Sequence, residues 1–426
     1  MRFQDGIIRA PDILVPARGI DYEKWAVVAC DQFTSDPGYW ERVEAFVGSA
    51  PSSLSVVLPE VHLTDPEDRT AWRIRSINAR MEDYLSSGVL ADIGACMVLV
   101  RREVPGLPVR SGLVAAIDLE AYDYRPGNGS PIRASEGTVL ERIPPRVRIR
   151  ENAPLELPHV QLLMDDPENK VIDPLARACA DGRYELLYDT PLMFGGGRLR
   201  GWRIPEDDPG LSAAMEALHT LDSWRRHGLL LAVGDGNHSL VTAKTCWERL
   251  RGSVPPDHPA RFAMAEMINL HDDGLVFEPI HRVLFGCKAT DFLAFAADWF
   301  NGEGTADGPV EILPSVSGES VSDVVVFSAD VSAVLRFPSA DRLAVDRIQP
   351  LVDAYSRRGG ASVDYIHGES ALHALAAGGA TAIRMPSVGK DRFFEDILRH
   401  GVYPRKTFSM GEAEGKRYYV EARRIR

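Results

Sequence analysis

The chain is poor in cysteine, in long apolar runs and in basic charge, and each shortage excludes a class of protein. Its five cysteines among 426 residues are scattered and never spaced as CxxC, so neither a disulfide framework nor a cysteine zinc site is indicated. Nothing in the sequence indicates haem or flavin. No apolar run approaches the ~18 residues of a membrane span, and Asp5, Pro11 and Asp12 interrupt the stretch where a signal peptide would need an apolar core. We therefore expect a cytoplasmic protein.

The shortage of basic charge bears on the partners. The chain has 48 Lys and Arg against 61 Asp and Glu, a net charge of −13 and a pI near 5.4. Such acidity argues against general affinity for nucleic acid or an anionic membrane, because both require a basic face. The expected partner is a small-molecule substrate, a homodimer is left open, and any phosphate site must be local.

Strand and helix patterns alternate along the chain and predict a mixed α+β fold. Apolar spacing predicts a helix with Trp72, Ile74, Ile77, Met81 and Leu85 on one face, and Asp36 is a candidate N-cap for another. Strands are expected over Trp25–Cys30, on either side of the turn PGLP at 105–108, and in a hairpin around Gly195–Gly197. After residue 285 the composition shifts to Val-rich strands with Gly/Ser turns. We expect domains at 1–285 and 286–426, the second a smaller α/β domain.

The stretch 229–244, LLLAVGDGNHSLVTAK, begins as a buried strand, turns at two glycines and becomes a helix near residues 237–239. The first N–H groups of a helix lack intrahelical partners and form an anion site. Glycine permits positive φ and close approach of a ligand, and Asp235 could hold a metal. The candidate phosphate-binding residues are Gly234, Asp235, Gly236, Asn237 and Ser239, with His238 as a candidate catalytic residue. The alternative is that Asn237 or Ser239 only caps the helix and that His238 is a satisfied core histidine.

Residues 133–150 hold five arginines against two glutamates in an otherwise acidic chain. Arg146, Arg148 and Arg150 alternate, which predicts that they share one face of a strand. Such a face could clamp a phosphate chain, and Arg133, Arg142 and Arg146 are the candidates for that role. The alternative is a solvated strand face on which arginine only adds solubility.

Further candidate residues follow apolar segments elsewhere in the chain. Asp31 ends the expected strand at 25–30 and is a candidate general base or metal ligand, or else it caps a turn. His281 and Arg282 could combine a proton shuttle with a guanidinium that binds phosphate, or else form a structural ion pair.

The string Gly234-Asp235-Gly236-Asn237-His238-Ser239-x-x-x-Ala243 resembles the DGxHRxxA signature of the ParB/sulfiredoxin-like fold, in which this turn binds nucleotide phosphates. The chain resembles one branch of that group, the DUF1015 family, through four further segments: Cys30-Asp31, Glu136-Gly137-Thr138 with Arg142, Pro279-Ile280-His281-Arg282 and the closing PRKTFSMGEAEGKRYYVE. The resemblance implies a ParB/sulfiredoxin-like core. Ser239 departs from it, because the wider group has Arg there, the residue that usually binds phosphate bidentately. Either backbone N–H groups and another arginine hold the anion, or this branch has lost nucleotide binding.

One branch of the ParB/sulfiredoxin-like group consists of free-serine kinases, and the resemblance therefore implies a nucleotide-dependent small-molecule kinase or phosphotransferase. Its cofactors would be Mg²⁺ and a nucleoside di- or triphosphate, and its acceptor an amino acid hydroxyl such as that of serine. Asp31, Glu136 and His238 are the candidate catalytic residues, and Asp235 is the candidate metal ligand. The alternative function is a nucleotide-binding regulatory or structural module without catalysis.

Overall fold

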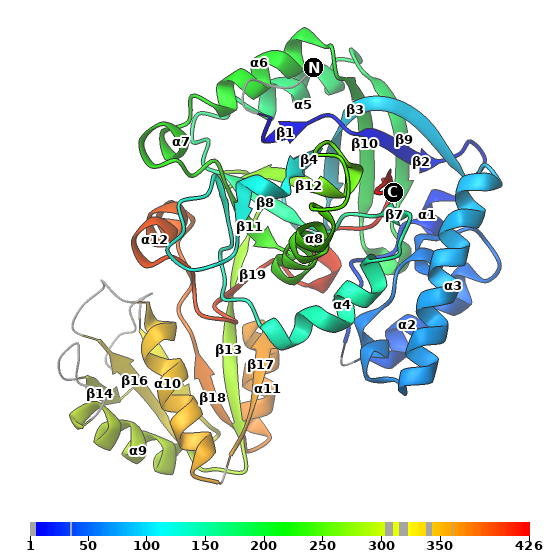
Figure 1. Cartoon of the computed structure of the whole chain (residues 1–426). Helices are drawn as coiled ribbons and strands as arrows, with labels where there is room; N and C mark the ends of the chain where they lie inside the picture. The colour runs from blue at the N-terminus through cyan, green and yellow to red at the C-terminus, as the bar shows by residue number, and fades with distance from the viewer. Residues whose placement is uncertain (1–5, 35, 303–309, 315–322, 338–342, 360) are drawn as a thin grey trace. The chain divides into compact units, whose positions relative to one another are not determined.

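The structure is a computed structural model that describes residues 6–34, 36–302, 310–314, 323–337, 343–359 and 361–426. It has the mixed α+β fold that the sequence predicts, and Figure 1 shows its helices and strands. The chain divides into two compact units, the first comprising Met1–Val276, Phe394–Val402 and Ala413–Arg426, the second Phe277–Phe393 and Tyr403–Glu412. These units divide at residue 276, whereas the sequence suggests a limit at 285, and the segment after residue 412 belongs to the first unit. The domain limits 1–285 and 286–426 stay a prediction.

An eleven-stranded sheet organises the described part of the first unit. In spatial order its main path is β5 (Tyr122–Asp123), β6 (Ile132–Arg133), β11 (Leu231–Asp235), β8 (Gln161–Met164), β12 (Phe262–Asn269), β4 (Arg110–Asp118), β3 (Leu90–Glu103), β10 (Arg198–Pro205) and β9 (Glu185–Pro191). Beside this path, β1 (Ile8–Arg9) pairs with β4 and β2 (Asp12–Pro16) with β3. The strand β11 lies between β6, to which it runs parallel, and β8, to which it runs antiparallel.

Successive side chains of a strand point to opposite faces of the sheet, and both faces of this sheet are buried. Met97 and Leu99 of β3 enter one core with the apolar face of the helix that follows β11, and Val98 and Val100 enter a second core on the other face. The helices of the first unit are α1 (Tyr22–Trp25), α2 (Pro37–Val47), α3 (Glu67–Ser86), α4 (Ile143–Arg150), α5 (Asp173–Ala180), α6 (Pro209–Leu218), α7 (Asp222–His227), α8 (Asn237–Leu250) and most of α12 (Phe393–His400).

Several local predictions are confirmed. The helix α3 buries Ile74, Ile77 and Met81, and Asp36 caps α2 by accepting a hydrogen bond from the Tyr39 N–H. The strands β3 and β4 pair antiparallel across the turn PGLP, and β9 and β10 form the hairpin around Gly195–Gly197. In each case short-range periodicity and turn residues determine the element.

Two local predictions are wrong. Residues 25–30 are not a strand, because Trp25 ends the short helix α1, and the segment that follows is extended with a single bridge between Val28 and Tyr418. Trp72 does not lie on the buried face of α3, since its side chain is 59% exposed. The buried face instead continues to Tyr84, which follows Ile77 and Met81 at helical spacing.

The second unit has its own sheet, with the spatial order β14 (Glu311–Pro314), β16 (Ser332–Arg336), β15 (Val324–Phe327), β18 (Thr381–Arg384), β13 (Phe277–Phe285) and β17 (Ser362–His367), and β19 (Phe408–Met410) also pairs with β13. Its helices are α9 (Ala289–Asn301), α10 (Ala344–Arg357) and α11 (Glu369–Ala377). The Val-rich strands are thus present, while the expected Gly/Ser turn at 315–322 lies outside the described residues. Within the described ranges, no helix is both long and apolar enough to span a membrane.

Candidate functional site

The strand, turn and helix predicted at residues 229–244 are confirmed as β11, Gly236 and α8. Gly236 takes the left-handed conformation with φ of 81°, whereas Gly234 remains in the strand. A Cβ on residue 236 would lie 2.9 Å from the Cα of Val160, so the position requires glycine for both its backbone angle and its space. The turn is therefore packed directly against the backbone that leads into β8.

The start of α8 presents backbone N–H groups without a side-chain cap from the residues that the structure describes. These N–H groups and the helix dipole favour an anion at this end. The Asn237 side chain lies at the same end, and within the described part of the chain its buried Oδ1 has no hydrogen-bond partner. The N–H groups can therefore bind an anion such as phosphate, whereas the Asn237 oxygen is itself an acceptor and suits a donor group of a ligand.

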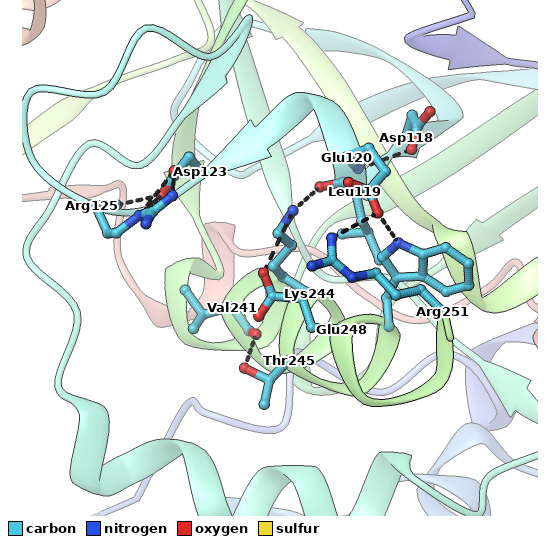
Figure 2. A network of polar contacts seen from close by, with 11 residues as sticks. Asp118, Leu119, Glu120, Asp123, Arg125, Val241, Lys244, Thr245, Glu248 and Arg251 are labelled. Carbon is cyan, nitrogen blue, oxygen red and sulfur yellow. Dashed lines mark hydrogen bonds and ion pairs between the residues drawn. The ribbon is translucent and has the colours of Figure 1, made fainter. Parts of the chain in front are cut away.

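Polar contacts with the segment Asp118–Glu120 hold α8 in place (Figure 2). The Lys244 Nζ donates a hydrogen bond of 2.8 Å to the Leu119 carbonyl oxygen, and the Trp247 Nε1 donates to Glu120 Oε1 at 2.5 Å. Arg251 also forms an ion pair with Glu120, with 3.5 Å between the atoms. These contacts fix the position from which the first turn of α8 faces the site.

Ser239, in the first turn of α8, contacts a histidine that the sequence analysis did not single out. Its Oγ lies 2.8 Å from His159 Nε2, and the other ring nitrogen, Nδ1, lies 2.7 Å from the Tyr419 hydroxyl oxygen. The Tyr419 oxygen also accepts a hydrogen bond of 3.2 Å from the Cys30 N–H. A serine, a histidine and a tyrosine from three distant segments thus form one chain of hydrogen bonds.

Asp31 lies beside the same histidine. Burial alone would raise the pKa of the Asp31 carboxyl, but His159, a hydrogen bond from Gln32 and the charge of Lys416 together hold that pKa below its ordinary value. Lys416 also forms an ion pair of 3.0 Å with Asp235 at the end of β11. Asp31 is therefore an ionised carboxylate. Lys416 interacts both with Asp31 and with Asp235, the last residue of β11.

Backbone hydrogen bonds explain how Lys416 reaches this place. The Ala29 N–H donates to the Arg417 carbonyl oxygen at 2.9 Å, and the Tyr419 N–H donates to the Val27 carbonyl oxygen at 2.9 Å. This short antiparallel contact sets Lys416 and Tyr419 beside Cys30 and Asp31. The pairing joins residues nearly 400 positions apart in the sequence.

Arg146 comes from the arginine cluster, but the strand predicted there is wrong. Residues 143–150 form the helix α4, which has prolines in its first turn and buries Ile143 and Val147, one helical turn apart. On this helix Arg146 and Arg150, four residues apart, share one face, while Arg148 lies on another. The three bind different carboxylates: Arg146 binds Glu60, Arg148 binds Glu67, and Arg150 binds Glu156. The predicted phosphate clamp of alternating arginines does not exist.

These elements surround a cavity that is open to solvent. Its volume is about 920 Å³ when the adjoining open solvent is counted. Its polar lining includes Glu60, Arg146, His159, Ser239 and Tyr419, and its apolar lining includes side chains of the 3-10 helix η1 (Ser53–Val56), of α3 and of α4. Burial raises the pKa of the Glu60 carboxyl, and nearby Asp31 adds to this effect, while Arg146 opposes it. The cavity thus joins an apolar interior to a polar wall at the start of α8.

Other predicted residues point elsewhere within the first unit. The Arg133 guanidinium donates to the carbonyl oxygens of Ser130 and His227, and Arg142 is exposed on the surface. His238 Nε2 accepts a hydrogen bond of 3.3 Å from the Val139 N–H, so this ring faces the loop after β6. Glu136 lies in that loop and is not among the residues that line the cavity.

His281 and Arg282 belong to β13 in the second unit, and both are buried there. His281 Nδ1 accepts a hydrogen bond of 3.1 Å from the Met385 N–H, and Arg282 donates to the side-chain oxygen of Gln349. Burial lowers the pKa of His281 to about 4. These contacts give both side chains structural partners within their own unit.

Among the described residues, no group of three or more His, Cys, Asp or Glu side chains is placed to hold a metal ion. Both oxygens of Asp235, the candidate metal ligand, have partners: Oδ1 accepts from the Gly236 N–H at 2.9 Å, and Oδ2 faces Lys416. A metal ion at this site would therefore need ligands from a bound molecule.

Four residues of the site were missed by sequence reasoning, namely Glu60, His159, Lys416 and Tyr419. His159 stands immediately before the apolar strand segment VQLLM, and Lys416 and Tyr419 lie in the polar and aromatic run GKRYYVE, so both segments carry a local signal. No local signal marks Glu60, because the apolar residues that precede it follow no regular pattern.

Comparison with known proteins places the chain in a group without an assigned activity. The profile of a family described as "Protein of unknown function (DUF1015)" matches residues 14–422. No curated protein sequence matches the chain.

Several solved structures are similar in fold. One is a free serine kinase variant in complex with AMP, with 12% identity and a TM-score of 0.41, covering 76% of this chain and 95% of that chain. Another is a free serine kinase variant in complex with ADP, with 11% identity and a TM-score of 0.41, covering 76% and 98%. A C-terminally truncated SbnI from Staphylococcus aureus has 10% identity and a TM-score of 0.39, covering 72% and 82%. At these values the likeness carries no argument about activity.

Proposed function

The chain belongs to the DUF1015 family, and from the geometry of its site we propose that it is a nucleotide-dependent phosphotransferase acting on the hydroxyl group of a small molecule. The phosphoryl donor is a nucleoside di- or triphosphate, and serine is the first acceptor to test. The observation that carries the proposal is the meeting of an uncapped helix N-terminus with two cations and an ionised carboxylate in the first unit.

Phosphoryl transfer requires positioning and charge stabilisation more than covalent chemistry from the protein. The N–H groups of α8 and the side chain of Lys416 would hold the phosphates, since Lys416 lies 3.0 Å from the last residue of β11. Arg146 would face the charge that develops on the transferred group, because it lines the cavity that also contains Ser239. The apolar interior of that cavity would exclude water from the acceptor.

A magnesium ion would fit this site only together with a nucleotide. Mg²⁺ usually takes one or two protein carboxylates and completes its shell with phosphate oxygens and water. Asp31 suits this role, since the pKa of its carboxyl is held low, whereas Asp235 is occupied by Gly236 and Lys416. Bound there, the ion would neutralise phosphate charge.

Proton transfer from the acceptor hydroxyl needs a base with a pKa nearer the working pH. Burial raises the pKa of Glu60, which lines the cavity, whereas Asp31 has a lowered pKa. In this proposal Glu60 therefore replaces Glu136 as the general base. Asp31 keeps the role of the carboxylate that would bind the magnesium ion.

A second function, nucleotide binding without catalysis, is favoured by one observation. Both cations already have protein partners, Arg146 with Glu60 and Lys416 with Asp235, so a regulatory module could release them on binding without any transfer. The two functions differ in whether a phosphorylated acceptor forms.

Titration calorimetry with ATP, ADP and CTP, with and without Mg²⁺, tests the binding that both functions share. Phosphorus NMR of the same mixtures with serine then separates transfer from binding alone. We expect Lys416→Met to weaken nucleotide binding by about 10-fold or more, the scale of one hydrogen bond to a charged group. Lys170→Met is the matched control, because Lys170 pairs with Glu168 on the surface. Absence of nucleotide binding at millimolar concentration would refute both functions.

A further inference from the structure

The hydroxyl of Ser239 occupies a position that ordinary helix capping does not explain. Its Oγ lies 2.8 Å from His159 Nε2, within hydrogen-bond reach, and both residues line the cavity. A hydroxyl is a weak nucleophile until a neighbouring base accepts its proton. The contact therefore supplies the first requirement of an activated serine.

A third residue orients the base. His159 Nδ1 lies 2.7 Å from the oxygen of Tyr419, whose side chain is buried and is also held by the Cys30 N–H. A neutral imidazole has one N–H group and one lone pair. In the tautomer that carries its hydrogen on Nδ1 and donates it to the Tyr419 oxygen, the lone pair of Nε2 faces the Ser239 hydroxyl, and this is the tautomer that a base requires.

Two carboxylates, those of Asp31 and Glu60, interact electrostatically with the imidazole, whose two nitrogens face Ser239 and Tyr419. The first N–H groups of α8 stand next to Ser239 and can stabilise negative charge on a reacting group.

We propose that Ser239 is a nucleophile activated by His159 and that it carries the phosphoryl group during transfer. The Oγ–H bond breaks as the proton passes to Nε2. The Oγ forms a bond to the terminal phosphorus of the nucleotide, the bond from that phosphorus to the bridging oxygen breaks, and the nucleotide leaves one phosphate shorter. The acceptor hydroxyl oxygen then attacks the phosphorus as its proton passes to Glu60, which later releases it to solvent. The bond between Oγ and the phosphorus breaks, and Oγ recovers its proton from His159.

This inference rests on the proposed function for the phosphoryl donor, but the nucleophile itself does not depend on a nucleotide. It gives the departure at position 239 a chemical role, because arginine there would hold a phosphate without reacting with it. Tyr419 acts as a positioning residue, since its hydroxyl oxygen bonds to the histidine ring and to the Cys30 N–H.

A fluorophosphonate probe tests the nucleophile without nucleotide. We expect the wild-type protein to be labelled at Ser239, as located by peptide mass spectrometry, and Ser239→Ala to lose this label. His159→Gln should slow labelling by about 10²-fold, the scale of a general base. Ser253→Ala is the matched control, because Ser253 is an exposed serine just after the same helix.

Urea unfolding of each variant separates loss of reactivity from loss of fold. If His159→Gln does not fold, Ser239→Cys provides the second test. A neighbouring histidine promotes ionisation of a thiol, so the thiol at position 239 should be alkylated faster than an ordinary cysteine thiol. The activated serine would be overturned if the folded wild-type protein does not react with the probe. It would also be overturned if folded His159→Gln is labelled as fast as the wild type.

Incubation with terminally labelled ATP or ADP, without acceptor, tests the phosphoryl step. We expect phosphoserine at residue 239 in the wild-type protein and none in His159→Gln. If Ser239→Ala still transfers phosphate from nucleotide to an acceptor, the phosphoserine step is wrong while the proposed function stands. If no nucleotide binds, the proposed function fails and the phosphoryl step fails with it, and the fluorophosphonate result alone decides the nucleophile.

Discussion

At the scale of single residues, Arg146 is the side chain whose charge matters most to the proposed reaction. It lines the cavity and binds Glu60, so the site itself holds its guanidinium in place. We expect Arg146→Ala to lower kcat by ~10²-fold or more, as is usual when one preorganised donor is lost, and to change nucleotide affinity less. Steady-state kinetics with calorimetry measures both. Arg148→Ala is the control, because Arg148 pairs with exposed Glu67 away from the cavity; an equal effect of both changes would remove Arg146 from the site.

His281 should make the second unit sensitive to acid. Burial lowers the pKa of its imidazole to about 4, below the ordinary 6.5, with Arg282, Arg384 and His367 acting in the same direction and Glu369 against them. The neutral form is therefore the native one, because Nδ1 accepts the Met385 N–H. The stability it contributes is complete above about pH 6.5 and is lost as pH falls towards 4, by on the order of 3 kcal/mol.

Urea unfolding at neutral pH and near pH 4 measures this loss. His281→Asn keeps an acceptor oxygen near the place of Nδ1 but does not titrate, so its stability should fall less on acidification than that of the wild type. An identical fall in both proteins would show that other groups determine the acid response.

The residues of the site could be predicted from the sequence only where a local pattern marks them. Asp235, Gly236 and Ser239 stand in the strand-to-helix turn, and the structure brings Ser239 into one cavity with Arg146. His159 and Tyr419 could not be assigned to it, because what joins them is a hydrogen bond between segments 260 residues apart. No local pattern indicates such a contact.

At the scale of elements, the turn between β11 and α8 depends on Gly236. A side chain there would be strained at φ of 81° and would approach the Val160 Cα to 2.9 Å. We expect Gly236→Ala to lower the free energy of unfolding by more than the ~1 kcal/mol that the left-handed conformation alone costs. Gly228→Ala is the matched control, since Gly228 has φ of +63° but no described atom within 4 Å of its added Cβ. Equal losses, measured by urea unfolding, would contradict the close packing.

The contrast between α8 and α4 shows which elements a sequence can specify. The helix α8 follows a long apolar run and two glycines, so its place is determined locally. In α4 the alternation of arginine with apolar residues imitates a strand, and only the proline pair in the first turn favours a helix. The burial of Ile143 and Val147 against the rest of the unit decides the outcome, and that packing is not local.

At the scale of the whole molecule, the segment Ala413–Arg426 completes the first unit. Arg417 is buried there and forms ion pairs of 2.7 Å with Glu266 and 2.5 Å with Glu421. Arg417→Ala would leave two buried carboxylates without their cation, and we expect it to lower the free energy of unfolding by about 3–5 kcal/mol. Arg424→Ala, at an exposed position of the same segment, should change it little. A small effect of Arg417→Ala in urea unfolding would show that this segment does not hold the unit together.

The return of the chain to its first unit also imposes an order on synthesis. A ribosome delivers Asp31, His159 and Ser239 early, but it releases Lys416 and Tyr419 only after it has made the whole of the second unit. Until then, the extended residues 27–29 lack the backbone partners that they have in the finished protein. A nascent or prematurely terminated chain would therefore contain the helix of the site but not its lysine or the tyrosine beside its histidine. The site would therefore be completed only when residues 413–426 fold back onto the first unit.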